Sequence, residues 1–156
     1  MIKFGEIGNY KNAVNIGYCV ATEEMHNGQA AIFDIAAKTA SHPATGKEEE
    51  LCIVMNCIQK PEVHSPNKYV IEKGEFPRLF TLESLKNRQI EMDSDQVSTE
   101  YSTLKAKDKL TAKTDGTWEK KDEVTGYPIY LEIVEKTAFN GEGLLCVVKC
   151  VQPAGE

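Results

Sequence analysis

The sequence predicts a mainly β fold, a small β-barrel or sandwich with an extended N-terminal arm and at most one short helix. Short runs of β-favouring residues recur at intervals of roughly ten residues, and tight-turn pairs such as Asp115-Gly116 separate several of them. Apolar and polar residues alternate most clearly in the last third of the chain. With 156 residues, the chain is long enough to bury one core without disulfide or metal staples.

We expect residues 1–12 to form the extended arm and residues 13–156 to form a single β-rich domain. Glycines interrupt the apolar residues of the arm, which disfavours a helix there. The arm could add a strand to a neighbouring sheet or fold back onto its own domain, and the sequence leaves both outcomes open. For the first outcome the candidate interface residues of the arm are Ile2, Phe4, Ile7 and Tyr10.

The first half of the domain predicts fewer regular strands. Apolar residues at 14–20 and 30–35 flank the turn pair Asn27-Gly28, which favours a hairpin. Residues 38–50 combine proline, glycine and the only dense acidic run of the chain, which is typical of an exposed loop. The nearly continuous apolar run Leu51–Ile58 predicts a strand that is covered on both faces or a short buried segment.

Prolines and glycine limit regular structure between residues 59 and 77, where we expect only Tyr69–Ile71 to pair. Strands are predicted over Phe76–Leu85, ending in a short turn, and over Gln89–Met92. Residues Asp95–Leu104 carry apolar side chains at helical spacing, and they form the one short helix that the pattern indicates.

The last third predicts two strand pairs. Leu110 and Ala112 alternate with polar neighbours, and the following Asp115-Gly116 turn predicts a hairpin that returns through residues 117–120. Strands over 128–134 and 144–151 follow. Trp118, the sole tryptophan, stands beside the hairpin turn. It either caps the sheet core or anchors an interface, and it joins the interface candidates.

Charge and cysteine content restrict the classes of function. The formal net charge of −6 is spread along the chain, and this disfavours nucleic acid as a partner because phosphate binding needs clustered Lys and Arg. No apolar stretch approaches the ~20 residues of a membrane-spanning helix, so we expect no membrane partner. Five cysteines, an odd number, with no charged-then-apolar leader favour a reducing cytosol over secretion.

The cysteine spacings do not predict a metal site. Cys146 and Cys150 have a spacing that zinc sites use, but on one strand they would lie about 13 Å apart at ~3.3 Å per residue. Cys52 and Cys57 would point to opposite faces of a strand. We therefore expect no metal and no other cofactor.

Nor does the sequence contain a motif for catalysis or phosphate binding. The three histidines, His26, His42 and His64, fall in predicted loops, where a solvated imidazole is the usual state. A Cys-His pair remains possible because such partners are not adjacent in sequence. We predict that the chain is not an enzyme, and we name no catalytic residue.

Four features occur in order in the last third: the run Leu104–Leu110, the hairpin Thr114–Trp118, the segment Gly126–Ile129 before the next strand, and a final apolar strand. Over Leu104–Val151 this plan resembles that of small virion proteins of tailed bacteriophages, the head decoration or capsid-stabilising kind. Lys107 stands where that family usually has glycine. The resemblance implies a virion structural protein, a capsid decoration or other head-associated component.

The resemblance also implies a set of partners. A barrel of this kind docks on a protein shell as a homo-oligomer, so the expected partner is the major capsid protein or another virion head protein. The expected location is the virion capsid, after assembly in the host cytoplasm. The residues alone also permit an alternative, a cytoplasmic β-barrel ligand-binding module or small enzyme of an uncharacterised bacterial family.

Overall fold

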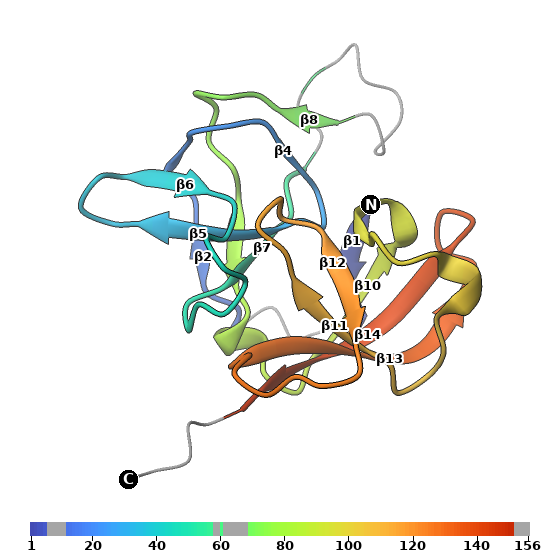
Figure 1. Cartoon of the computed structure of the whole chain (residues 1–156). Helices are drawn as coiled ribbons and strands as arrows, with labels where there is room; N and C mark the ends of the chain where they lie inside the picture. Colours follow the sequence, from blue (N-terminus) through green and yellow to red (C-terminus); the bar gives the residue numbers. More distant parts are fainter. Residues whose placement is uncertain (6–11, 58–59, 61–68, 152–156) are drawn as a thin grey trace, which may run out of the picture.

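The computed structural model describes residues 1–5, 12–57, 60 and 69–151, and it is mainly β, as predicted (Figure 1). Three short 3-10 turns lie wholly within these residues: Glu83–Leu85 (η3), Ser94–Gln96 (η4) and Tyr101–Thr103 (η5). None of these turns has the length or apolar character that crossing a membrane requires.

The strands form two six-stranded sheets. The first sheet contains, in spatial order, β2 (Asn15–Ile16), β9 (Leu79–Thr81), β7 (Cys52–Val54), β5 (Ala30–Asp34), β6 (Thr39–Ser41) and β3 (Val20–Ala21). The second sheet contains β1 (Ile2–Phe4), β10 (Gln89–Asp93), β14 (Gly143–Cys150), β13 (Ile129–Thr137), β11 (Lys109–Ala112) and β12 (Trp118–Lys121). A separate pair joins β4 (Met25–His26) to β8 (Val70–Ile71). All these pairings are antiparallel except β3 with β6.

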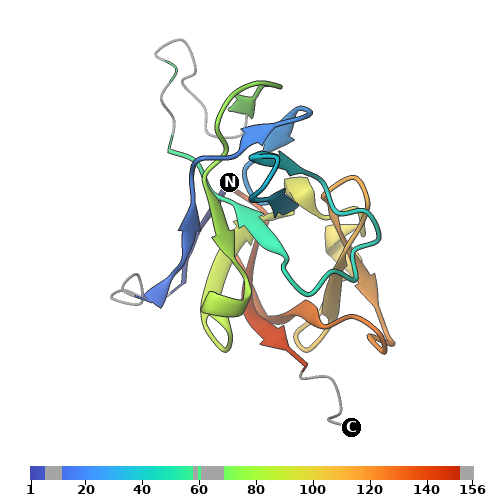
Figure 2. The same cartoon turned by 90° about the vertical axis from the view of Figure 1, so that its left-hand side faces the viewer.

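The larger hydrophobic core is shared by the two sheets, which lie beside each other in Figure 2. Strand alternation places Ile129, Leu131 and Ile133 of β13 on its inner face. From the first sheet, Ile53 and Phe80 reach the same core. Because one set of apolar side chains covers both sheets, neither sheet has a separate interior on this side.

A smaller core lies on the opposite face of the first sheet. It contains Cys52 and Val54 of β7, whereas Ile53 between them belongs to the larger core. All three side chains are fully buried. The prediction of a strand covered on both faces within 51–58 is therefore confirmed, and the two cores explain why this stretch is apolar without alternation.

Trp118 joins the two sheets. Its side chain is fully buried in the larger core, and its Nε1–H donates a hydrogen bond to the carbonyl oxygen of Gly28 at 2.8 Å. Beside it, the amide of Ala30 donates to the carbonyl of Gly116 at 2.7 Å. Of the two roles open to this tryptophan, the structure thus shows the core one.

The arm residues fall in two groups. Ile2–Phe4 form β1, which pairs with β10 of the same chain, and this is the second of the two outcomes that the sequence left open. Ile2 is 9% exposed in the larger core, and the Phe4 ring lies edge-on to Phe80 with centroids 5.3 Å apart. Ile7 and Tyr10 lie outside the described residues.

Two predictions for the first half of the chain are corrected. No hairpin forms across Asn27-Gly28, because β5 pairs instead with β6 and β7. The β5–β6 turn is tight, since the Asp34 carboxylate accepts the amide hydrogen of Ala37 at 2.9 Å. The predicted loop over 38–50 consequently contains β6.

The predicted helix over Asp95–Leu104 is also wrong. The segment contains only η4 and η5, and between them Val97 bridges to Trp118 and the Ser98 amide donates to the Trp118 carbonyl at 2.7 Å. Backbone pairing with β12 thus replaces helical hydrogen bonding. The apolar side chains at 97, 101 and 104 still pack on the larger core, which accounts for their spacing.

Candidate functional site

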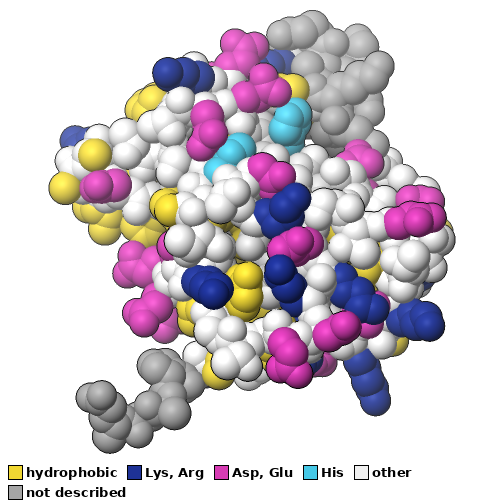
Figure 3. Space-filling view, in the orientation of Figure 1, with side chains coloured by type: hydrophobic (Ala, Val, Ile, Leu, Met, Phe, Trp, Pro, Cys, Tyr) yellow, Lys and Arg dark blue, Asp and Glu magenta, His cyan; other side chains and the backbone are white. Residues whose placement is uncertain are grey.

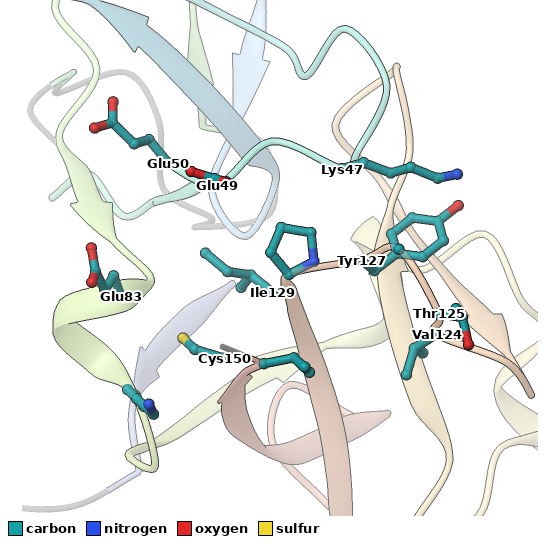
Figure 4. A pocket seen from close by; sticks show the side chains of 13 residues that line it. Lys47, Glu49, Glu50, Glu83, Val124, Thr125, Tyr127, Ile129 and Cys150 are labelled. Atoms are coloured by element: carbon teal, nitrogen blue, oxygen red, sulfur yellow. The ribbon is translucent and has the colours of Figure 1, made fainter. Parts of the chain in front are cut away.

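A groove of about 780 Å³ lies where the two sheets meet. The first sheet contributes the loop before β7 and turn η3, and the second contributes the β12–β13 loop and the end of β14 (Figure 4). Its volume is within the range of ligand-binding clefts. The residues that line it are Lys47, Glu49, Glu50, Glu83, Lys86, Val124, Thr125, Gly126, Tyr127, Pro128, Ile129, Cys150 and Val151.

The floor of the groove is apolar. Ile129 belongs to the larger core, and Pro128 precedes it at the start of β13. Cys150 is half-buried, with Sγ 4.0 Å from the carbonyl oxygen of Leu82. Val151 is 50% exposed and extends this surface outward. A ligand that covers the floor therefore removes apolar surface from water.

One wall of the groove is acidic. Glu49 and Glu50 come from the loop before β7 and Glu83 comes from η3, and Figure 4 shows the three on the same side of the floor. All three residues are exposed. Their carboxylates make no ion pair with any residue that the structure describes.

Lys47 and Lys86 also line the groove, and Lys47, on the opposite wall, already has a partner. Lys47 places its Nζ 5.2 Å from the centroid of the Tyr127 ring, a distance at which the charge is attracted to the ring face. Figure 4 shows both side chains across the floor from the three carboxylates. The groove therefore has an acidic wall and an aromatic one.

The loop that carries the acidic wall is fixed against the second sheet. Gly46 lies so close to β11 that a Cβ atom built on it would stand 2.0 Å from the carbonyl oxygen of Ala112. Next to it, Glu48 accepts hydrogen bonds from the amide and hydroxyl of Thr45 at 2.7 and 3.0 Å. Partial burial acts to raise the pKa of Glu48, but the hydrogen bonds outweigh it and lower that pKa overall.

The cysteines show no nucleophilic arrangement within the described residues. Burial raises the pKa of Cys52 and of Cys146 to about 12, so both thiols stay protonated near neutral pH. Burial also raises the pKa of Cys19 and of Cys150. Cys57 is exposed and lines a smaller hollow of about 240 Å³ with Arg78.

His26 and His42 lie on the same side of the molecule, where Figure 3 shows two histidines among acidic side chains. His42 Nδ1 is 3.3 Å from a carboxylate oxygen of Glu23, and its Nε2 is 3.1 Å from the side-chain oxygen of Gln29. His26 pairs with Glu24 at 3.3 Å. His64 lies outside the described residues, in which no group of three or more possible metal ligands occurs.

A second surface feature is the tip of the β5–β6 hairpin, residues 34–38. The hairpin extends from the body of the molecule at the left of Figure 1, and hydrophobic side chains gather along it in Figure 3. Ile35 is 62% exposed, and Ala36 and Ala37 beside it are exposed as well. The turn is held by the Asp34 carboxylate, so the apolar tip has a defined shape.

The described interface candidates do not form a surface. Ile2 and Trp118 are buried in the larger core, and Phe4 packs against it. The acidic wall was detectable in the sequence only as the run Glu48–Glu50. Glu83 and Tyr127 line the same groove as this run only because strands that are far apart in the sequence pair in the fold.

The chain matches no protein-family model and no curated protein sequence. Its function must therefore be inferred from its own surfaces.

Proposed function

We propose that this chain is a non-enzymatic structural component of a bacteriophage virion. In this role it attaches to the major capsid protein or another head protein as a capsid decoration or head-associated component, and it does so as a homo-oligomer. The observation that carries the proposal is the apolar tip of the β5–β6 hairpin. An exposed group of adjacent apolar residues on a projecting turn is typical of a surface that another protein covers.

The resemblance of residues 104–151 to phage decoration proteins supports the same function. The features that carry it occupy β11, β12, β13 and β14, which are consecutive along the chain. Many copies on one shell would gain avidity, so the contact made by each small tip can be modest. The net charge of −6 disfavours contact between the attached copies and nucleic acid.

The test is co-sedimentation of the purified chain with empty heads assembled from the shell protein that is encoded beside its gene. We expect binding at a fixed ratio, visible as added density on the particles in electron micrographs. Ile35→Glu should weaken binding by roughly tenfold or more, because the carboxylate would be buried unpaired. The matched control is Val134→Glu, which changes a 40% exposed residue of β13 on the second sheet.

Two results would reject the proposal: no added density at saturating protein, or equal loss of binding for Ile35→Glu and Val134→Glu. A gene neighbourhood without capsid, portal or tail components would also count against it. The volume of the groove favours a second candidate function, a ligand-binding module of the cytoplasm. A metabolic gene neighbourhood and binding of a small molecule at one site per chain would support that function instead.

A further inference from the structure

We propose that the groove between the two sheets docks an extended arginine-bearing segment of a partner protein. This inference is independent of the proposed function, because the groove and the hairpin tip are formed by different segments. It concerns the chemistry of the groove alone.

The first argument is the division of the groove into an apolar floor and a charged rim. Pro128, Ile129 and Val151 supply the floor, and exposed carboxylates stand above it on one side. Protein interfaces have this anatomy, with an apolar centre and a polar edge. An arginine side chain fits both parts, since its methylene groups cover apolar surface while the guanidinium reaches the rim.

The second argument is charge. Glu49, Glu50 and Glu83 make no ion pair with the described residues, and Lys47 is held over the Tyr127 ring. Lys86, which follows η3, is the other lysine in the lining, so the three carboxylates still exceed the lysine charge that is left without a ring partner. A guanidinium can bind a carboxylate through two parallel hydrogen bonds, which a lysine ammonium cannot do. The net charge of −6 also attracts a cationic segment to the chain, which adds to the local attraction by the groove carboxylates.

The third argument concerns the size of the ligand. The carboxylates come from two elements, the loop before β7 and η3, and a segment with two cationic side chains can contact both. An extended chain with two arginines on alternate residues places both on one face. The apolar residues between and beside them remain available for the floor. Nucleic acid and an anionic membrane are disfavoured because both carry the charge of the wall.

The probe is the peptide acetyl-Leu-Arg-Val-Arg-Leu-amide, titrated into the ¹⁵N-labelled full chain and followed by amide chemical shifts and calorimetry. We expect shifts at Glu49, Glu50, Glu83 and Tyr127, and binding that weakens as salt is added. A peptide with citrulline in place of both arginines has the same shape without the charge. It should bind about tenfold more weakly or not at all.

The decisive variant is Glu49→Gln/Glu50→Gln/Glu83→Gln, which should raise the Kd of the arginine peptide about tenfold. The matched control is Asp95→Asn/Glu100→Gln/Glu135→Gln, which removes three exposed carboxylates outside the groove. It changes the net charge equally and should leave the Kd within a factor of about two.

The amide spectrum of each variant reports whether it is folded, so a lost interaction is distinguishable from an unfolded chain. Equal weakening by both triple variants would mean that only the overall charge matters, and it would overturn the proposal. The same conclusion follows from equal affinity for the citrulline peptide, from shifts confined to another surface, or from no binding at millimolar peptide. None of these results bears on co-sedimentation with capsid shells.

Discussion

The geometry of the groove depends on one residue, Gly46. Its φ of +76° lies in the left-handed region, and the chain passes so close to Ala112 that no side chain fits between them. The loop that bears Glu49 and Glu50 starts from this contact. The position of the acidic wall therefore depends on a residue that has no side chain.

We expect Gly46→Ala to lower the free energy of unfolding by about 2–4 kcal/mol, because a steric clash adds to the backbone cost. Urea denaturation measures this change. Gly141→Ala is the matched control, since Gly141 has a φ of +94° but no atom within 4 Å of an added Cβ. Its cost should be limited to about 1–2 kcal/mol. Equal losses for the two variants would show that the contact with Ala112 is unimportant.

Single residues differ in how well the sequence predicts their roles. Ile129, Leu131 and Ile133 were predicted to share a face because strand alternation is a local property, and all three are buried in the larger core. The carboxylates of Glu50 and Glu83 could not be placed together, since no local pattern joins them. Their proximity to the same floor follows from the pairing of β7 with β9.

At the scale of elements, β1 contributes two side chains to the larger core: Ile2 is buried in it and Phe4 packs against it. Ile2 pairs with Met92 across β1 and β10, and both side chains are buried in the larger core. Lys3 alternates to the outer face, where it forms an ion pair with Glu91 at 2.7 Å. The strand therefore has an apolar and a charged side, although it is only three residues long.

Ile2→Ala should reduce the free energy of unfolding by about 2–4 kcal/mol, the usual cost of truncating a buried isoleucine. Lys3→Ala should cost less than about 1 kcal/mol, because the Lys3 side chain is 54% exposed and solvent weakens its ion pair. Thermal unfolding followed by circular dichroism provides both values. If the two substitutions had the same small effect, β1 would be a loosely attached arm instead of a strand of the core.

Strands could be predicted from the sequence where apolar and polar residues alternate over a long enough stretch. Both strands of the β11–β12 hairpin, β13 and β14 follow from alternation and from turn pairs such as Asp115-Gly116. Apart from β5, the strands of the first half have two or three residues, which is too short for a period to be visible. The failed helix over 95–104 has the same origin, because pairing with β12 is a tertiary effect that outweighs local preference.

At the scale of the whole molecule, several carboxylates stabilise the folded state in their ionised form. Hydrogen bonds from Thr117, together with Lys113, lower the pKa of Asp115. Partial burial acts to raise the pKa of Asp108, but the Lys120 ammonium at 2.9 Å and the Lys105 amide and charge together outweigh it and lower that pKa. The pKa of Glu48 is lowered as well. Each folded-state pKa thus lies below the value in the unfolded chain.

The stability from these groups is fully present above the unfolded pKa values and is lost as the pH falls through the folded ones. The reference values are 3.8 for Asp and 4.5 for Glu. We therefore expect the urea midpoint to be constant from pH 7 to about pH 5 and to fall below about pH 4. A midpoint that is the same at pH 7 and pH 3 would contradict the lowered pKa values.

The sheet order could not be predicted from the sequence. β1 and β14 come from the two ends of the described chain and flank β10, which lies between them in sequence. No local signal specifies such pairings, since they depend on which arrangement covers the most apolar surface. The mainly β class was predictable because it requires only the kind of element and not its neighbours.

The place of β1 has a consequence for biosynthesis. Residues 2–4 leave the ribosome before β10 exists, and β10 gains its second neighbour only when residues 143–150 have been translated. At about 5–20 residues per second, this delay is on the order of ten seconds. Throughout that time β1 has at most one strand to pair with, and its apolar side lacks the complete sheet that buries it in the folded chain.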